Sequence, residues 1–323
     1  MASVIRRHFS ALCDSVTSRG LCRLCGACAL VCPVDVIRVS HSKAELVGDC
    51  ISCGLCYVAC PVINKAPEFE PKRVLLARPT TAPPKFKTCG ATTVILTSLL
   101  SKGTVDGILV SRMGPDVNPV SYCAYAPSEV MAAGGANYFS TGHLEELRAP
   151  LREGKRMAVV GVGCTIEGAR LVASISKRYS ELIRYSVGLF CSSQLDRSRT
   201  LSVLERRGVT PSQIDSMNIR EGLLHVGMVD GRKESVRLSA LDEAKRRGCA
   251  FCLDVENSSA DISIGEMGAP KGYVILVVRT RAGEEVLNSL GEALELNEVS
   301  EDVLSTARAV VGKKLSTLAR VRR

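Results

Sequence analysis

The sequence predicts an α/β protein, α+β overall, in which a small cysteine-rich module precedes a larger domain built on a mixed sheet. Three observations support this. A cysteine pattern occurs twice within residues 22–61, strand-like and helix-like segments alternate after about residue 70, and 323 residues exceed one typical domain. We therefore expect two domains, residues 1–69 and 70–323.

The repeated pattern is Cys-x2-Cys-x2-Cys-x3-Cys-Pro, and every position recurs at one constant offset. Bacterial-type ferredoxins use this spacing to hold two 4Fe-4S clusters, and the fourth cysteine of each run binds the other cluster. The pattern thus predicts two sets of ligands. The first set is Cys22, Cys25, Cys28 and Cys60, and the second set is Cys50, Cys53, Cys56 and Cys32.

The sequence around the cysteines fits this interpretation. Gly26 and Gly54 follow the second cysteine of each run and allow close backbone approach, and a hairpin over 36–39 and 44–47 is expected to join the halves. Disulfides would need an oxidising compartment, and we find no apolar signal segment at the N-terminus. Zinc sites take their ligands as two pairs, not as four in one tight run. Two clusters are therefore favoured.

Composition restricts the class of protein and partner. No run approaches the roughly 18 apolar residues of a spanning helix, and 15 cysteines fit a reducing compartment, so we expect a soluble, cytoplasmic protein. The net charge of +9 is compatible with nucleic acid, a membrane face, or acidic small molecules and proteins. Aromatic residues make up only 4% and Trp is absent, so stacking platforms for nucleic acid are scarce. Acidic cofactors or partner subunits are favoured.

Periodicity and turn residues place the elements in order. We expect a leader helix over 1–20, the module to about 64, and a linker over 65–84 with a strand-like stretch at 74–77. Ser140 or Thr141 is expected to cap a helix that runs to Pro150. The basic end, 313–323, is expected to be a solvated face or, less favoured, a docking surface for an acidic subunit. The other segments are helices at 92–102, 166–177, 201–207, from 283 and at 303–323, and strands at 107–110, 157–160, 183–190, 261–265 and 273–280.

Four further cysteines form a third set: Cys164, Cys191, Cys249 and Cys252. The last two have metal-ligand spacing, and each of the others ends a predicted buried strand, where sites assemble in open α/β sheets. A third 4Fe-4S cluster, a structural zinc and ordinary buried thiols all remain open on this spacing. The remaining cysteines are expected to be core or surface thiols, namely Cys13, Cys89 and Cys123.

Three glycine-containing segments have features of binding loops. Residues 161–168 follow a strand and open a helix, although Ile166 stands where a dinucleotide fingerprint requires glycine. Residues 88–93 also open a helix and suit either capping or a pyrophosphate. The segment 261–272 contains three glycines and a lysine, which allow close backbone approach or simply flexibility.

Taken in order, several motifs resemble the family of coenzyme F(420) hydrogenase/dehydrogenase beta subunits. The resemblance covers essentially everything after about residue 70. The two-cluster module resembles that of the respiratory F(420) dehydrogenase input subunit and of the deazaflavin-dependent sulfite reductase. The motifs are Thr88-Cys89-Gly90 with Thr93, Gly103 to Gly107, Ala158 to Cys164, Gly188 to Cys191, Cys249-x2-Cys252-x-Asp254, and Ala260 to Gly265 with Val278 to Thr280.

The resemblance implies an iron-sulfur flavoprotein subunit, with FAD in its α/β domain, that exchanges hydride with reduced coenzyme F(420). Single electrons would pass through 4Fe-4S clusters, including one on the third set, to a hydrogenase, respiratory dehydrogenase or heterodisulfide reductase-like complex. A membrane complex would provide any peripheral membrane attachment. The implied cofactor contacts are Gly90, Ala91, Thr92 and Thr93, then Gly161, Gly163 and Thr165, and near the isoalloxazine or substrate Gly265, Gly268 and Lys271.

Cofactor chemistry requires no catalytic side chain, and His8, His41, His143 and His225 are expected to be structural or exposed. Two departures from the family pattern lie near the implied contacts. The usual Gly-Thr-Pro-Cys-Gln turn is here residues 161–165, Gly-Val-Gly-Cys-Thr, and Val274 replaces a small or hydroxyl residue. Two alternatives therefore stay open: a non-catalytic relay without flavin, and a flavoprotein of this fold that uses NAD(P)H, ferredoxin or another substrate.

Overall fold

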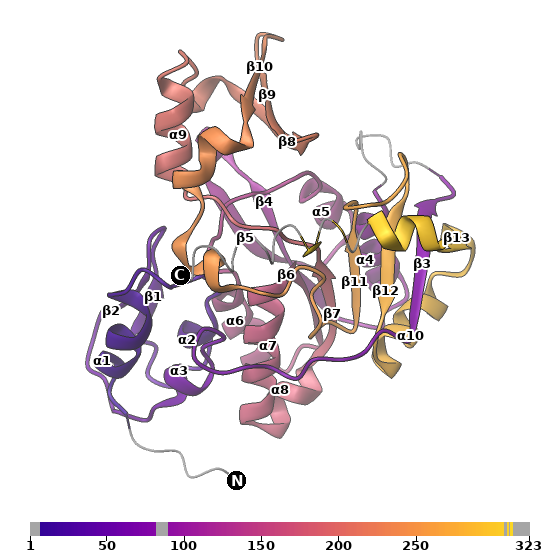
Figure 1. Ribbon diagram of the computed structural model, residues 1–323. Helices are drawn as coiled ribbons and strands as arrows, with labels where there is room; N and C mark the ends of the chain where they lie inside the picture. Colours follow the sequence, from indigo (N-terminus) through magenta and orange to yellow (C-terminus); the bar gives the residue numbers. More distant parts are fainter. Residues whose placement is uncertain (1–6, 82–89, 307–308, 310, 313–323) are drawn as a thin grey trace.

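The computed structural model describes residues 7–81, 90–306, 309 and 311–312, shown as a ribbon in Figure 1. An eight-stranded sheet of order β13-β3-β12-β11-β7-β6-β4-β5 forms its centre. Strands β4, β6, β7 and β11 are parallel, and the remaining neighbours pair antiparallel, which confirms the predicted mixed α/β sheet. The strands are β3 Arg73–Pro79, β4 Gly107–Met113, β5 Pro119–Ala124, β6 Met157–Val162, β7 Ile183–Leu189, β11 Ile262–Gly265, β12 Val274–Val278 and β13 Leu294–Glu298.

Both faces of this sheet are covered, which explains why its central strands are continuous apolar runs such as Val274–Val278. One face packs against α4 (Ala91–Ser101), α5 (Pro127–Ala132) and α10 (Arg281–Ser289). The other face packs against α6 (Arg148–Arg152), α7 (Gly163–Ile175) and α8 (Lys177–Leu182).

The cysteine-rich module contains a short helix before each fourth cysteine and a hairpin between its halves. Gly26 and Gly54 precede α2 and α3 with φ of 86° and 77°, a region that glycine enters without strain. The predicted hairpin is confirmed, and of the predicted leader helix residues 9–17 are helical. The elements are α1 Phe9–Leu12, a π-helix Cys13–Thr17, α2 Ala27–Leu30, β1 Ile37–Val39, β2 Ala44–Leu46 and α3 Leu55–Val58.

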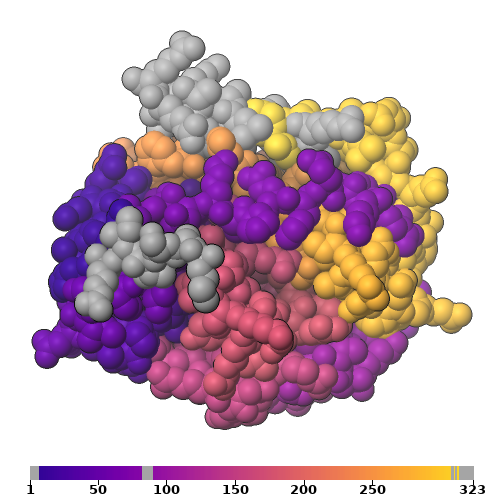
Figure 2. Space-filling view, turned by 90° about the horizontal axis from the view of Figure 1, so that it is seen from below, coloured from indigo at the N-terminus to yellow at the C-terminus, as the bar shows by residue number. Residues whose placement is uncertain are grey.

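The module packs directly onto the sheet domain. A Cβ on Gly26 would lie 2.2 Å from the carbonyl oxygen of Gly142, so only glycine permits this approach. The Gly142 amide donates to the Leu24 carbonyl and the Leu144 amide to the Cys25 carbonyl, both at 2.9 Å. The chain then crosses the underside of the sheet domain to reach β3, as Figure 2 shows. The predicted domain boundary falls in this crossing segment.

Several features differ from the sequence-based expectations, including β5, α5 and β13, which were not predicted. Strands β8 (Ile214–Arg220), β9 (Leu223–Met228) and β10 (Lys233–Arg237) form a separate antiparallel sheet that packs with α9 (Arg197–Glu205) around its own core. The outer strands β8 and β10 are polar and largely exposed, whereas β9 is apolar with alternate residues buried; the sequence analysis assigned none of the three. The predicted Ser140 or Thr141 cap is wrong, because Gly142 precedes the 3-10 helix His143–Leu147 and no side chain caps it.

Most of the predicted terminal helix, 303–323, lies outside the described residues. No helix within the described ranges combines the length and apolar character that crossing a bilayer requires.

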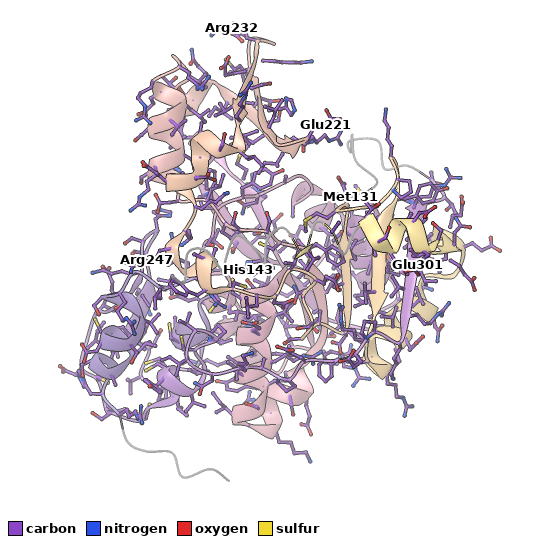
Figure 3. All side chains as sticks on the ribbon, viewed as in Figure 1. Met131, His143, Glu221, Arg232, Arg247 and Glu301 are labelled. Carbon is purple, nitrogen blue, oxygen red and sulfur yellow. The ribbon has the colours of Figure 1, made fainter. Side chains whose placement is uncertain are left out.

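His143 lies in the interior between the sheet and the module (Figure 3). Its Nε2–H donates to the Val160 carbonyl at 2.8 Å, and its Nδ1 lies 2.8 Å from the Ser121 hydroxyl. Burial lowers the pKa of this imidazole to about 4 from an ordinary 6.5. The ring is therefore neutral in the folded protein over most of the pH range, in agreement with a structural role.

The depressed pKa predicts acid sensitivity. Because the unfolded chain takes up a proton near pH 6.5 and the folded chain only near 4, stability present above 6.5 is lost as pH falls toward 4, by an amount on the order of 3 kcal/mol. We expect His143→Gln to remove most of this decline. Denaturant unfolding from pH 7 to 4 measures it, with exposed His41→Gln as control; equal slopes for His143→Gln and wild type would contradict it.

Candidate functional site

The second set of cysteines lines one small cavity in the module. Cys50, Cys53 and Cys56 come from the second run, and Cys32 reaches this cavity from the first run, as the ferredoxin rule requires. In the first set, Cys60 and Cys22 lie close enough to Cys25 to influence its ionisation. The structure thus brings together the two predicted sets, each completed by the fourth cysteine of the other run.

Buried thiols crowd together at both sites. Burial, assisted by neighbouring thiols, raises the pKa of Cys25 to about 12 and that of Cys56 to about 12. Backbone N–H groups of Ala27 and Tyr57 oppose this by hydrogen bonding to the two sulfurs. Burial also raises the pKa of Cys28, and its neighbours include thiols of both sets. The two sets are therefore adjacent, and their thiolates need a cationic ligand to be stable there.

Buried thiolates that receive backbone N–H bonds fit iron-sulfur clusters. In the described part of the chain, no group of three or more His, Cys, Asp or Glu side chains gathers tightly enough to hold a single metal ion. A 4Fe-4S cluster makes a different demand, because four thiolates surround a group of four irons.

The third set also converges, although its members come from three separate segments. Cys164 is the second residue of α7 and Cys191 follows β7, while Cys249 and Cys252 lie in and just after the 3-10 helix Arg247–Phe251. Gln194 connects two of them, since its backbone amide lies 3.4 Å from the Cys249 sulfur and its side-chain amide 3.9 Å from that of Cys191.

Cys164 connects this set to the module. Its pKa is raised, first by burial and next by the thiol of Cys25, with smaller effects from Cys249 and Cys252. The packing is tight, because a Cβ on Gly168 of α7 would lie 3.4 Å from the Cys25 sulfur. The three sets therefore form a row: third set, first set, second set.

Arg23 lies where the third and first sets meet, and sequence reasoning missed it. Its Nε donates to the Gly248 carbonyl at 3.3 Å and its Nη1 lies 3.4 Å from Glu167 on α7. Burial lowers the pKa of the guanidinium, but Cys252, Cys164 and Glu167 outweigh this and raise it. The signal in the sequence was the position of Arg23 between the ligands Cys22 and Cys25. Its role could not be predicted from this position, because its partners Gly248 and Glu167 are distant along the chain.

Glu167 is itself unusual. Burial raises the pKa of its carboxyl to about 7, because the opposing charge of Arg23 compensates only in part. A buried, fixed positive charge therefore stands beside two sets of thiols with an incompletely ionised partner.

The predicted cofactor contacts lie at the carboxyl edge of the parallel strands. Strands β3 and β11 are both antiparallel to β12, so β3 runs in the same direction as β11. Because α4 is the next helix after β3, its start falls near the carboxyl edge. Gly90 precedes α4 with φ of 66°, and Ala91, Thr92 and Thr93 form its first turn. Residues 161–165 begin at the end of β6, and residues 265–271 begin at the end of β11, at the same edge. Thr88 and Cys89 lie outside the described residues.

Protein neighbours already explain several of these glycines. A Cβ on Gly161 would lie 2.7 Å from the Thr165 side chain, and one on Gly163 would lie 3.1 Å from the Asp254 carboxylate. A Cβ on Gly265 would lie 2.1 Å from the Phe190 ring. Their role toward a cofactor, like those of Gly268 and exposed Lys271, stays a prediction.

One observation at this edge fits an additional bound group. Asn257 is fully buried with φ of 63°, and its Nδ2 donates to the Gly161 carbonyl at 3.0 Å. Its Oδ1 has no hydrogen-bond partner among the described residues. A buried acceptor of this kind is costly unless water or a ligand supplies a donor.

Comparison with known proteins places this geometry in a family. The models for the N-terminal and C-terminal parts of the coenzyme F(420) hydrogenase/dehydrogenase beta subunit match residues 74–148 and 154–302. A model for a 4Fe-4S dicluster domain matches residues 15–61. Together the first two cover more than half of the chain.

Several curated proteins are similar to this chain. An uncharacterized protein of Methanocaldococcus jannaschii is 30% identical, over 60% of this chain and 56% of its own length. The coenzyme F(420)-dependent sulfite reductase of the same organism is 27% identical, over 89% of this chain and 49% of its own length. This chain thus spans about half the length of these two relatives. One of the subunits of the F(420)H(2) dehydrogenase of Methanosarcina mazei is 27% identical, over 88% of this chain and 86% of its own length.

A solved structure has the same fold. A chain of the F(420)-reducing nickel–iron hydrogenase complex of Methanosarcina barkeri superposes with a TM-score of 0.70 at 24% identity, over 81% of this chain and 92% of that one. The matched models, the dicluster pattern and this shared fold agree with one another. The chain therefore belongs to the family of coenzyme F(420) hydrogenase/dehydrogenase beta subunits and carries an N-terminal 4Fe-4S dicluster domain.

Proposed function

We propose that this chain is an electron-transfer subunit that oxidises reduced coenzyme F(420) through FAD and passes electrons singly through three 4Fe-4S clusters to a partner complex. The row of cysteine sets, which begins at the carboxyl edge of the sheet and crosses the module, carries this proposal. A hydride brings two electrons, whereas each cluster accepts one. FAD, when bound, supplies the conversion from two-electron to one-electron transfer.

The chain's own residues would hold these groups. The first, second and third sets would each bind one cluster through four thiolates. The first turn of α4, from Gly90 to Thr93, would bind the flavin pyrophosphate, because the N-terminus of a helix presents free N–H groups and partial positive charge. Lys271 would attract the acidic tail of the substrate.

Arg23 would stabilise the more negative, reduced form of the nearest clusters. It is a buried positive charge at the junction of the third and first sets, where low solvent access leaves its field poorly screened. Glu167 would weaken this effect to the extent that it is ionised.

A flavin-free relay is the second candidate, and one observation favours it. At Gly161 and Gly163 the positions where a Cβ would stand are bordered by the side chains of Thr165 and Asp254, so both glycines have a packing role without a cofactor. In that case the same row of clusters would carry electrons between two protein partners.

Anaerobically prepared protein tests the proposal directly. We expect iron and acid-labile sulfide, about one FAD released per chain on denaturation, and reduction of a viologen dye by reduced coenzyme F(420) but not by NADH. Iron without flavin would favour the relay. Iron and flavin without reduction by the deazaflavin would refute the proposed substrate.

The third cluster can be tested by substitution. We expect Cys164→Ser to lower iron content by about one third and to leave the two clusters of the module detectable by electron paramagnetic resonance. Cys123→Ser is the matched control, since burial likewise raises the pKa of Cys123 to about 12 and we expect no cluster there. Equal iron in both variants would exclude a cluster on the third set.

The role of Arg23 predicts opposite shifts in two variants. Arg23→Gln removes a buried positive charge and should lower the reduction potential of the cluster on the third set, whereas Glu167→Gln should raise it. Exposed Arg247→Gln is the control, since solvent screens its charge. Redox titration followed by paramagnetic resonance measures the potentials, and unchanged potentials in Arg23→Gln would contradict the assignment.

A further inference from the structure

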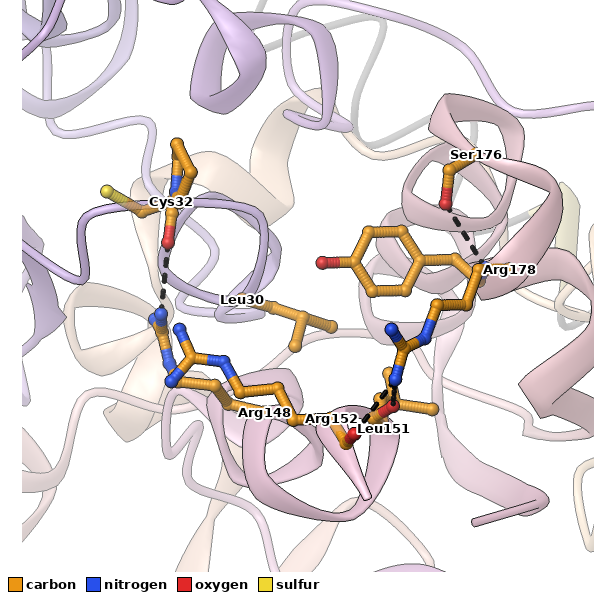
Figure 4. A pocket seen from close by; sticks show the side chains of 9 residues that line it. Leu30, Cys32, Arg148, Leu151, Arg152, Ser176 and Arg178 are labelled. Atoms are coloured by element: carbon orange, nitrogen blue, oxygen red, sulfur yellow. Dashed lines mark hydrogen bonds between the residues drawn. The ribbon is translucent and has the colours of Figure 1, made fainter. Parts of the chain in front are cut away.

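A pocket of about 330 Å³ opens beside Cys32, the member of the second set that the first run contributes (Figure 4). Arg148, Arg152 and Arg178 line it together with Tyr179 and an apolar floor that includes Leu30. The site described above does not use this pocket. Three guanidinium groups around one hollow favour a negatively charged occupant.

Two of these arginines are already engaged. Arg148 donates to the Cys32 carbonyl at 3.1 Å and to that of Ala29, and it pairs with Asp35 at 3.0 Å. Arg178 donates to the carbonyls of Leu151 at 3.2 Å and Arg152 at 2.8 Å. Both hold backbone in place, so their presence alone has a structural explanation.

Arg152 is different. It is exposed, its guanidinium lies beside that of Arg148 in Figure 4, and its side chain makes no hydrogen bond or ion pair with any residue that the structure describes. Asp35 forms direct ion pairs with Arg38 at 2.6 Å and with Arg148 at 3.0 Å, whereas Arg152 acts on its carboxylate through charge alone, without a direct ion pair. The positive charge of the pocket is therefore only partly neutralised within the described chain.

The surroundings of the pocket resemble a protein interface. Val34 and Ile51 are 41% and 57% exposed and line the neighbouring cavity of the second set. Arginine is enriched in protein interfaces, and exposed apolar side chains beside it supply surface that a partner can bury. The second set is also the end of the row that lies farthest from the third set, where electrons would leave or enter the chain.

We infer that this pocket, with Val34 and Ile51 beside it, is the docking surface for an acidic electron-transfer protein, and that Arg152 receives one of its carboxylates. The inference rests on the proposed function only in that the second set carries a cluster. A small anion would not contact the apolar side chains of Val34 and Ile51. Its binding would also not require a position beside Cys32, whereas electron transfer to a docked protein would.

The test uses the full chain with its iron content verified and an acidic bacterial-type ferredoxin as the probe. Affinity is measured in roughly 0.01 M and roughly 1 M salt, where the Debye length is about 30 Å and about 3 Å. Arg152→Glu is compared with Arg232→Glu, a matched charge reversal on the distant β9–β10 loop seen in Figure 3. Arg152→Lys tests rescue by charge alone.

We expect Arg152→Glu to weaken binding about tenfold at low salt, with little difference from wild type at high salt. Arg232→Glu should bind like wild type, and Arg152→Lys should keep most of the affinity. No binding by wild type, equal loss in both reversals, or binding independent of salt would each overturn the inference. So would phosphate binding that Arg152→Glu abolishes while ferredoxin binding persists, because the pocket would then be a small-anion site. This measurement of binding does not depend on which hydride donor the protein uses. A failure of the deazaflavin assay and a failure of the docking inference can therefore be told apart.

Discussion

The close approach of Gly26 to Gly142 is the contact on which the arrangement of the sites depends. Gly26 needs a positive φ to start α2 and also has the Gly142 carbonyl where a Cβ would be. The flanking hydrogen bonds fix the ligand loop of the first set against the sheet domain. Because this contact seats Cys25 beside α7, the first and third sets become neighbours. The module is thus part of the same packed unit as the domain that follows it.

Arginines complete this attachment by binding backbone of the ligand loops. Arg246 donates to the carbonyls of Cys22 at 3.2 Å and Ser42 at 2.7 Å, and Arg148 does the same at Cys32. Each guanidinium thereby holds a loop and adds positive charge close to clustered thiolates. Both arginines are also paired with carboxylates, Arg148 with Asp35 at 3.0 Å and Arg246 with Asp196 at 3.4 Å, which helps to fix each guanidinium against its loop.

The sequence revealed the sites that depend on local spacing and concealed those that depend on distant contacts. Cys22 to Cys60 were predictable because ligands of one loop lie close in sequence. Convergence of Cys164 and Cys191 was predicted from a topological rule on strand ends; the structure places Cys164 near Cys249 and Cys252, and Gln194 contacts both Cys249 and Cys191. The polar strands β8 and β10 were missed because they carry little apolar pattern, and the short apolar strand β9 between them was not recognised. Arg23 was missed because its partners, Gly248 and Glu167, are far along the chain.

In this chain the turn 161–165, which departs from the usual family pattern, packs against the Asp254 carboxylate. Gly163 stands where the resembled pattern has proline, and any Cβ there would lie 3.1 Å from the Asp254 carboxylate. That carboxylate is fixed, since it accepts hydrogen bonds from the Ser258 amide at 3.1 Å. A pyrrolidine ring would have to displace it by a few tenths of an ångström. In this chain Gly163 accommodates the Asp254 carboxylate two residues after Cys252, so the turn packs closely against the third set.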